Sequence, residues 1–434
     1  MRIVADLHIH SRFSRATSKK ITPSEIARFA KIKGLDVVGT GDFTHPQWLA
    51  EMRDRTTEIN DTGLFQLAKG SASPRFMLTS EVCTVTDPIG TLKQIHHVIL
   101  AKGFDEVTQI NERLSQYGDL TVDGRPLLQM SAPHLVEEVM AVSKDNELIP
   151  AHVWTPWFSL FGDRSGYDRI EDCYHEMTRH IHALETGLSS DPPMNWRLSE
   201  LDRFTLVSNS DCHSCWPWRI GREANVFELP EVSYRGILEV LRKKDPKRFK
   251  YTIETNPAYG KYHWTGHRNC GVRLPPEEAV KSKTLCPVCR RKMTKGVEQR
   301  VEELSDRPRG FKPPLASGFI HLLPLSEIIA SVLEASSPAV QSVWSAYNRL
   351  VSFFGSEYAV LIDASPEALG KVTEAGITNA VLKVRAGRAY VTPGYDGVYG
   401  ELNLQKVKVD EDEAPHREDM KTPQRNMTEW CSNL

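Results

Sequence analysis

Short apolar runs alternate with amphipathic stretches along roughly the first half of the chain. Seven apolar runs cover residues 4–10, 36–42, 76–85, 95–101, 147–154, 182–187 and 205–213. Between them, apolar residues recur at the spacing of a helix that buries one face. This alternation is typical of βα units around a parallel sheet. Because seven strand candidates favour a closed (β/α) barrel over an open sheet, the predicted fold class is α/β.

Two of the intervening helices have clear signals at their ends. The segment 22–34 offers Thr22 as N-cap, Pro23 at the first helical position and Gly34 as a stop signal. The segment 132–144 has the same apolar periodicity. Both predicted helices lie between consecutive strand candidates, as βα units require.

The character of the chain changes after about residue 242. A basic, turn-rich stretch reaches about Pro314, and residues 261–312 contain 13 Lys and Arg against 6 Asp and Glu. From Gly318 the periodicity returns and predicts helices at 326–335, 339–355 and 366–374, with strands or short buried segments at 358–363 and 380–387. The predicted divisions are 1–248, 249–314, a mainly helical or mixed region 315–403, and a charged, disordered tail 404–434.

Bulk composition narrows the class of protein. The 434 residues are 40% hydrophobic and carry a formal net charge of −2, so any surface for nucleic acid must be local. No apolar run is long enough for a signal peptide or a membrane span, and we expect a cytoplasmic protein with no membrane partner. Eight cysteines are too dilute for a disulfide scaffold, and the closeness of three of them suggests metal in a reducing compartment.

Residues of the types that commonly bind metals, namely His, Asp and Glu, lie at or near the carboxyl end of each strand candidate. Since the carboxyl ends of barrel strands form one face, these side chains should converge on one site. The candidates are His8 and His10, Asp42 and His45, Glu81, His96 and His97, His152, and Asp211 with His213. Glu185 also ends a strand candidate, where it could support a ligand from behind or be purely structural. A single such histidine is more often a hydrogen-bonded core residue, but the whole set predicts a metal cluster.

The ligand types indicate the ions and the chemistry. Mixed imidazole and carboxylate ligands suit zinc, manganese or iron better than magnesium or calcium, although magnesium could serve in turnover. The number of ligands predicts two or three divalent ions. Such clusters hold a phosphoryl group and lower the pKa of bound water, so the sequence favours phosphoester hydrolysis. No Ser-His or Cys-His nucleophile is evident.

A second group of candidate ligands lies in the basic stretch. His267, Cys270, Cys286 and Cys289 have the H-x2-C-x15-C-x2-C spacing of a structural zinc site. A segment this small has little core of its own, so one zinc would supply its folding energy. Its basic side chains could contact nucleic-acid phosphates or could form an ordinary solvated face. They include Arg268, Arg290, Arg291 and Lys292.

Several motifs resemble those of the PHP (polymerase and histidinol phosphatase) superfamily of distorted seven-stranded barrels with three metal ions. They are DLHIHS (6–11), GTGD (39–42), the strand glutamate Glu81, AHVW (151–154) and SDCHS (210–214). By position, this resemblance implies a first ion on His8, His10, Glu81 and Asp211. It implies a second ion on Glu81, His152 and one of His96 and His97, with His96 favoured, and it makes His45 and His213 candidates for a third. Phe43 stands where the second motif usually has histidine. The implied catalytic residues are Asp211, His213, Glu81, His8 and His10.

The order of the downstream motifs resembles the endonuclease Q family from residue 1 to about 403. The motifs are GKYHWTGHRNCGV (260–272), CPVC (286–289), KGVEQRVEELSDRP (295–308) and PGYDGVYGEL (393–402). The resemblance implies a DNA-repair endonuclease that cuts 5′ to deaminated bases (uracil, hypoxanthine, xanthine) and abasic sites. The products would carry a 3′-hydroxyl and a 5′-phosphate. The three divisions would then be a catalytic barrel, a zinc-binding domain and a DNA-contacting region of a nucleoid-associated monomer.

Aromatic and basic side chains near the predicted metal site are candidates for DNA contact. Trp154, Trp157 and Arg219 could stack on a flipped base or bind its backbone, although packing beneath a long loop explains each one equally well. Residues 347–354 loosely resemble a sliding-clamp-binding peptide, but burial of that helix is favoured.

Two other functions remain open at this stage. A PHP-type phosphatase of a small phosphorylated metabolite would need the same metal site but would leave the basic zinc segment unexplained. A non-catalytic nucleic-acid-binding module would keep the metal for structure alone, and the near-complete ligand set argues against it.

Overall fold

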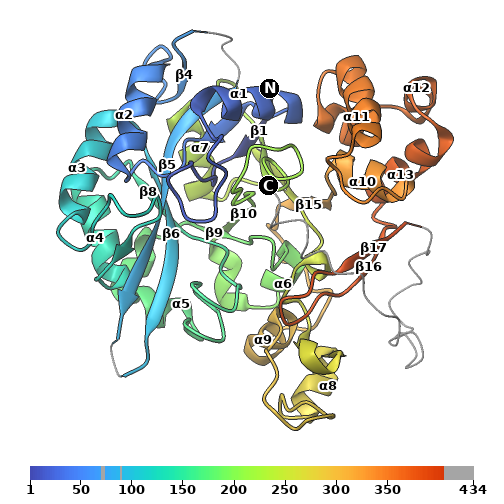
Figure 1. Ribbon diagram of the computed structural model, residues 1–434. Helices are drawn as coiled ribbons and strands as arrows, with labels where there is room; N and C mark the ends of the chain where they lie inside the picture. Colours follow the sequence, from blue (N-terminus) through green and yellow to red (C-terminus); the bar gives the residue numbers. More distant parts are fainter. Residues whose placement is uncertain (70–73, 88–89, 405–434) are drawn as a thin grey trace.

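A mixed β-sheet forms the centre of the computed structural model, which describes residues 1–69, 74–87 and 90–404 (Figure 1). Nearly all of the predicted disordered tail, from residue 405 on, lies outside the described residues. Each of the seven predicted runs overlaps a strand. These are β1 (Arg2–Asp6), β2 (Val37–Gly39), β5 (Arg75–Thr86), β6 (Lys93–Ala101), β8 (Glu147–Pro150), β9 (Ala183–Glu185) and β10 (Thr205–Val207).

The sheet is mixed, whereas the sequence predicts a parallel one. Strand β1 pairs with β2, and β2 with β5, in parallel, but β5–β6 and β6–β8 are antiparallel. The short connection between β5 and β6 explains the first of these antiparallel pairings, because a parallel crossover needs a longer connection that usually includes a helix. Strands β9 and β10 form a separate parallel pair.

Loop contacts join this pair to the main sheet on both sides. Val153 N donates to Glu185 O (3.0 Å) after β8 and β9, and His10 N donates to Cys212 O (3.1 Å) after β1 and β10. The segments that follow these four strands therefore lie together. Among the predicted metal ligands, they carry His8, His10, His152, Asp211 and His213.

Three strands that the sequence analysis missed extend the sheet beyond β1. They are β11 (Ala224–Glu228), β12 (Phe249–Glu254) and β15 (Gly318–His321), in the order β15-β12-β11-β1. Strands β12 and β15 lie within the second and third predicted divisions, so both divisions contribute to the sheet of the first. Shorter strands are β3 (Thr56–Glu58), β4 (Phe65–Leu67) and β7 (Leu127–Leu128).

The two helices with clear sequence signals are confirmed. Helix α1 (Pro23–Lys33) has Thr22 accepting a hydrogen bond from Glu25 N, and it ends at Gly34, whose φ is +99°. Helix α4 (Ala132–Val142) begins at Ser131. The other helices around the sheet are α2 (Pro46–Arg55), α3 (Phe104–Leu114), α5 (Ile170–Tyr174), α6 (Pro192–Asn195) and α7 (Tyr234–Lys243).

The C-terminal region is helical where two strands were considered. Residues Ala359–Asp363 form a π-helical turn, and 380–387 fall mostly within α13 (Ala375–Arg385). Ile377, Ala380, Val381 and Val384 are buried at helical spacing, so a helix, not a strand, explains this run of apolar residues. The predicted helices here are α10 (Leu325–Val332), α11 (Gln341–Phe354) and α12 (Pro366–Val372).

A buried ion pair joins this helical region to helix α1. Lys33 Nζ lies 2.7 Å from Glu357 Oε1, and Tyr347 OH donates to Glu357 Oε2 at 2.7 Å. Tyr347 and Leu350 are fully buried. The segment 347–354, which resembles a peptide that binds a sliding clamp, therefore contributes to the core. Among the described residues, no helix is long and apolar enough to cross a membrane.

The remaining elements form a small unit below the sheet in Figure 1. Strands β13 (Thr265–His267) and β14 (Val272–Leu274) form a hairpin next to α8 (Pro276–Lys281) and α9 (Val297–Leu304). Strands β16 (Tyr390–Thr392) and β17 (Glu401–Asn403) form another. Asp396, in the turn between β16 and β17, accepts hydrogen bonds from Arg268 N (2.7 Å) and Thr294 Oγ1 (2.6 Å). The last described residues therefore pack on the unit that carries the cysteines.

Candidate metal centre

Two groups of potential ligands, all buried except the partly exposed Asp211, share one glutamate at the ends of the central strands. The ligand atoms of His8, His10, Glu81 and Asp211 all lie within 4.8 Å of one another, and so do those of Glu81, His96 and His152. The predicted ligand sets of the first and second ions therefore come together from distant parts of the sequence.

The two oxygens of Glu81 face different groups. Oε2 lies 3.3 Å from His10 Nε2 and 3.7 Å from His8 Nε2, while Oε1 lies 2.8 Å from His96 Nδ1 and 3.1 Å from His152 Nε2. Asp211 Oδ1 completes the first group at 2.9 Å from His10 Nε2. A carboxylate placed in this way can bridge two ions.

Unusual backbone conformations place two of these ligands. Asp211 and His152 have φ values of +45° and +31°, a region that non-glycine residues rarely occupy. Asp211 N donates to His8 O (2.9 Å), which holds the strained turn against the segment after β1. Such strain costs on the order of 1–3 kcal/mol per residue and is concentrated at functional sites.

Two further carboxylates orient the imidazoles from behind. Asp42 accepts from His10 Nδ1 (2.9 Å), and Glu185 accepts from His8 Nδ1 (3.0 Å) and from His152 N (2.9 Å). These bonds keep the proton on Nδ1 and leave Nε2 of both histidines facing the cluster. Asp42, predicted as a ligand, lies outside both groups, and its oxygens accept hydrogen bonds from His10, Ser11 and Ser14.

The buried donor atoms fit divalent metal ions. His8 Nε2, His10 Nε2 and Asp211 Oδ1 are buried and make no hydrogen bond among the described residues. Leaving such atoms unpaired is costly, whereas coordination would satisfy all three. Nitrogen and carboxylate oxygen donors together suit zinc and its first-row neighbours.

The electrostatics of the cluster lead to the same conclusion. Burial lowers the pKa of His8, but Glu185 and Glu81 outweigh it and raise that pKa well above the usual value. Burial likewise raises the pKa of Glu81, but His96, Arg125 and His8 hold it well below the usual value. The clustered carboxylates thus stabilise positive charge between the ligand side chains. Bound divalent cations would supply this charge in place of protons.

Three other predicted ligands lie outside both groups. His45 donates from Nε2 to Thr121 O (3.2 Å) and its ring stacks on Phe13, so it does not reach the cluster. His97 hydrogen-bonds with Tyr174 (3.0 Å) and Thr84 (2.9 Å), because neighbouring side chains on β6 point to opposite faces. His213 lies beside the first group, with its ring centroid 4.7 Å from that of His10.

One residue of the cluster was missed at the sequence level. Arg125, in the segment between α3 and β7, places Nη1 3.2 Å from Glu81 Oε2. Its sequence context is a polar turn, TVDGRP (121–126), which carries no motif. The contact between Arg125 and Glu81 forms because this turn folds over the ends of the strands, which the sequence pattern does not indicate.

The structure separates the three predicted DNA-contacting residues near the cluster. Trp154 is buried, packs on Phe161 and donates to Asn195 Oδ1 (2.8 Å), so it supports the fold and is closed to DNA. Trp157 is 37% exposed, and Arg219 is partly exposed. These two remain available for a ligand.

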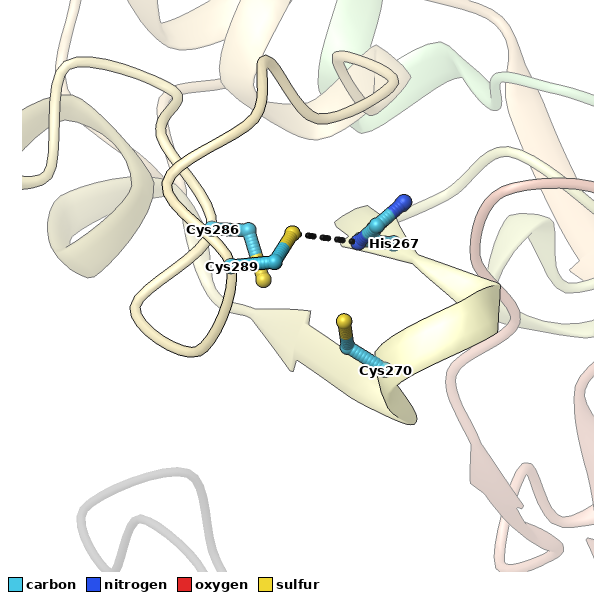
Figure 2. A group of neighbouring side chains, drawn as sticks. All are labelled: His267, Cys270, Cys286 and Cys289. Carbon is cyan, nitrogen blue, oxygen red and sulfur yellow. Dashed lines mark hydrogen bonds between the residues drawn. The ribbon is translucent and has the colours of Figure 1, made fainter.

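The predicted zinc ligands form a third group of donor atoms. Figure 2 shows the side chains of His267, Cys270, Cys286 and Cys289 pointing toward one another, with Cys289 Sγ 3.3 Å from His267 Nδ1. Burial raises the pKa of Cys286, but the backbone amides of Cys289 and Val288 outweigh it and lower that pKa to about 6, which favours the thiolate that binds metal. Arg268, Arg290, Arg291 and Lys292 are exposed around this group.

Comparison with known proteins covers most of the chain. A family model for the MJ0043 C-terminal domain matches residues 324–388. The uncharacterized protein MJ0043 of Methanocaldococcus jannaschii is 35% identical over 268 residues, which is 59% of this chain but only 32% of the relative. The chain thus spans about a third of that relative's length.

Two solved structures are similar over nearly their whole length. The lesion-specific endonuclease PfuEndoQ from Pyrococcus furiosus has a TM-score of 0.83 and 33% identity, covering 94% of this chain and 98% of its own. A structure of endonuclease Q in complex with a 27-mer duplex bearing an abasic lesion at the active site has a TM-score of 0.82 and 33% identity, covering 95% and 100%. At this identity and coverage, the chain belongs to the endonuclease Q family.

Proposed function

We propose that this protein cuts the phosphodiester bond 5′ to deaminated bases (uracil, hypoxanthine, xanthine) and abasic sites in DNA, leaving a 3′-hydroxyl and a 5′-phosphate. As a member of its family it is a metal-dependent DNA endonuclease. The observation that carries the proposal is Glu81, which is shared between two groups of potential ligand atoms, together with the three buried atoms of the first group that make no hydrogen bond among the described residues. The relative with an abasic duplex at its active site supports the substrate class.

The proposal extends to the organisation of the chain. The strands β1, β2, β5, β6, β8, β9 and β10 would form a distorted PHP-type barrel, with residues 249–314 as a zinc domain and 315–403 as a helical DNA-contacting region. Support comes from the order of strand pairings and from the loop contacts that join β9 and β10 to their neighbours.

The side chains of the cluster would have distinct tasks. Divalent ions, when bound, would stabilise the negative charge on the phosphoryl oxygens and lower the pKa of a bound water. Asp42 and Glu185 fix the rings of His10 and His8 so that the same nitrogens always face the substrate side. His213, partly exposed beside Asp211, would take a proton from the attacking water or give one to the departing 3′-oxygen.

Matched labelled duplexes, with and without one deoxyuridine, test the proposal. We expect a single cut 5′ to the deoxyuridine, a ligatable 3′-hydroxyl, no cut in the undamaged duplex, and loss of activity with a chelator. Hydrolysis of a small phosphate ester without cutting DNA would support a phosphatase instead. Binding to the damaged duplex without any cut would support a non-catalytic binding module.

The exposed cations beside the cysteines should hold the DNA backbone. Changing Arg290, Arg291 and Lys292 together to glutamine is expected to weaken binding to damaged and undamaged duplexes alike. The dependence of log Kd on log salt should flatten by up to about 0.9 for each phosphate that the variant no longer neutralises. Preference for the damaged base should survive, because phosphate contacts position the protein and do not specify sequence.

The measurement is affinity against salt concentration for both duplexes. Changing Arg53 and Arg55, both exposed on α2, to glutamine provides a control for the removal of charge alone. A salt slope unchanged in the triple variant would mean that this face does not contact DNA.

A further inference from the structure

Arg125 is held next to the metal ligands by a turn that is fixed on both sides. Gly124 N donates to Phe13 O (3.1 Å), Thr44 Oγ1 donates to Gly124 O (3.1 Å), and Cys83 N donates to Pro126 O (2.9 Å). A Cβ at Gly124 would lie 2.3 Å from Asp42 Oδ2, so only glycine lets the turn come this close. The position of Arg125 is thus built into the fold.

Most of the hydrogen-bonding capacity of this guanidinium is unused. An arginine side chain carries five N–H donors, and among the described residues Arg125 uses one of them, from Nη1 to Glu81 Oε2. Its side chain is 23% exposed, so the rest of the group can meet a molecule that enters from solvent. A mostly buried cation with free donors is suited to bind an oxyanion.

The residue that accepts a hydrogen bond from the Arg125 side chain, within the part of the chain that the structure describes, is also the residue that both metal groups share. Once Glu81 and Asp211 serve as ligands, their charge is shared with cations, and Arg125 stands beside those cations with Asp123 as its nearby counter-charge. An anion between the guanidinium and the metal groups would resolve this repulsion. A phosphodiester in the act of hydrolysis is such an anion and gains negative charge toward the transition state.

We propose that Arg125 binds a non-bridging oxygen of the phosphate that is hydrolysed and stabilises the charge that develops there. The inference rests on the proposed function, in which water adds to phosphorus and the bond to the 3′-oxygen breaks. Arg125 keeps its proton throughout and contributes charge and hydrogen bonds only.

Substitution at this position should reduce turnover while leaving the metal content intact. Arg125→Gln, assayed on the deoxyuridine duplex at saturating protein, is expected to lower the rate of cutting about 10²–10³-fold. Arg125→Lys should recover part of the activity, because it keeps the charge but not the planar fork of donors. Arg113→Gln, which removes an arginine that pairs with Glu138 on the outer helices, is the control.

Binding of inorganic phosphate to the zinc-loaded protein gives a readout that does not depend on DNA cutting. We expect Arg125→Gln to weaken phosphate affinity at least about tenfold relative to the wild type and to Arg113→Gln. Equal phosphate affinity in the wild type and Arg125→Gln would overturn the inference, even if no duplex is cut. If the wild type cuts no duplex but binds phosphate through Arg125, the proposed function is wrong and the inference about Arg125 stands.

Two further outcomes would count against a contact to the reacting phosphate. Loss of metal from Arg125→Gln, measured by elemental analysis, would mean that Arg125 only holds Glu81 in place. If Arg125→Gln weakens duplex affinity but leaves the rate at saturation unchanged, Arg125 contacts a flanking phosphate and not the one that is hydrolysed.

Discussion

Asp211→Ala is expected to abolish DNA cutting, by at least about 10³-fold, while binding to a damaged duplex is largely kept. Asp211 offers the first metal group a carboxylate oxygen that is buried, unpaired and 2.9 Å from His10 Nε2. Its removal leaves three ligand side chains in that group and takes negative charge from the place where cations are needed. The expected cost exceeds that of removing one hydrogen-bond donor to a transition state, which is about 10²–10³-fold.

The variant should also change the metal content of the protein. Elemental analysis is expected to show fewer ions per chain than in the wild type, with the second group, Glu81, His96 and His152, still able to bind. Asp54→Ala, which removes an exposed carboxylate on α2, is the matched control and should leave both quantities unchanged. Full activity of Asp211→Ala with unchanged metal content would move the active site elsewhere.

Sequence spacing predicted the metal groups well where ligands lie on strands or directly after them. His8 and His10 alternate along one strand direction, and the same alternation allows only one of His96 and His97 to face the cluster. The structure places His96 there and sends His97 to Tyr174. The alternation of side chains along a strand decides which of two neighbouring histidines faces the cluster, and this alternation can be read from the sequence.

Spacing could not distinguish a metal ligand from the residue that supports it. Asp42 was grouped with the ligands because it follows β2, but its oxygens accept bonds from His10 and from Ser11 and Ser14. Arg125 was missed for the opposite reason, since a turn far from any strand brings it to Glu81. Both facts depend on long-range packing that no local pattern contains.

The C-terminal region shows the same limit for secondary structure. Residues 380–384, AVLKV, have the composition of a strand, and only the burial of Ile377, Val381 and Val384 on one face identifies a helix. A short apolar run is compatible with both elements, and packing against α10 decides between them.

Changing Cys286 and Cys289 together to serine is expected to remove one zinc per chain and to loosen residues 260–300. The four donor side chains come from the end of β13, the turn after it and the CPVC turn. Because these pieces have few buried apolar side chains of their own, zinc would supply most of their folding free energy, typically about 10–16 kcal/mol of apparent binding energy in small zinc domains. Faster hydrogen exchange and proteolysis in this segment should accompany the loss of zinc.

The effect on cutting should be one of substrate binding. Arg300 donates to Phe161 O (3.0 Å), and Lys295 pairs with Asp163 (2.7 Å), so the zinc unit is attached to the loop that follows His152. Loosening it is expected to raise the duplex concentration needed for half-maximal rate, while the ions of the Glu81 groups stay bound. Cys173→Ser, at a buried cysteine outside the unit, is the control. Unchanged zinc in the double variant would refute the zinc assignment, and loss of all metal would show that the two sites fold as one.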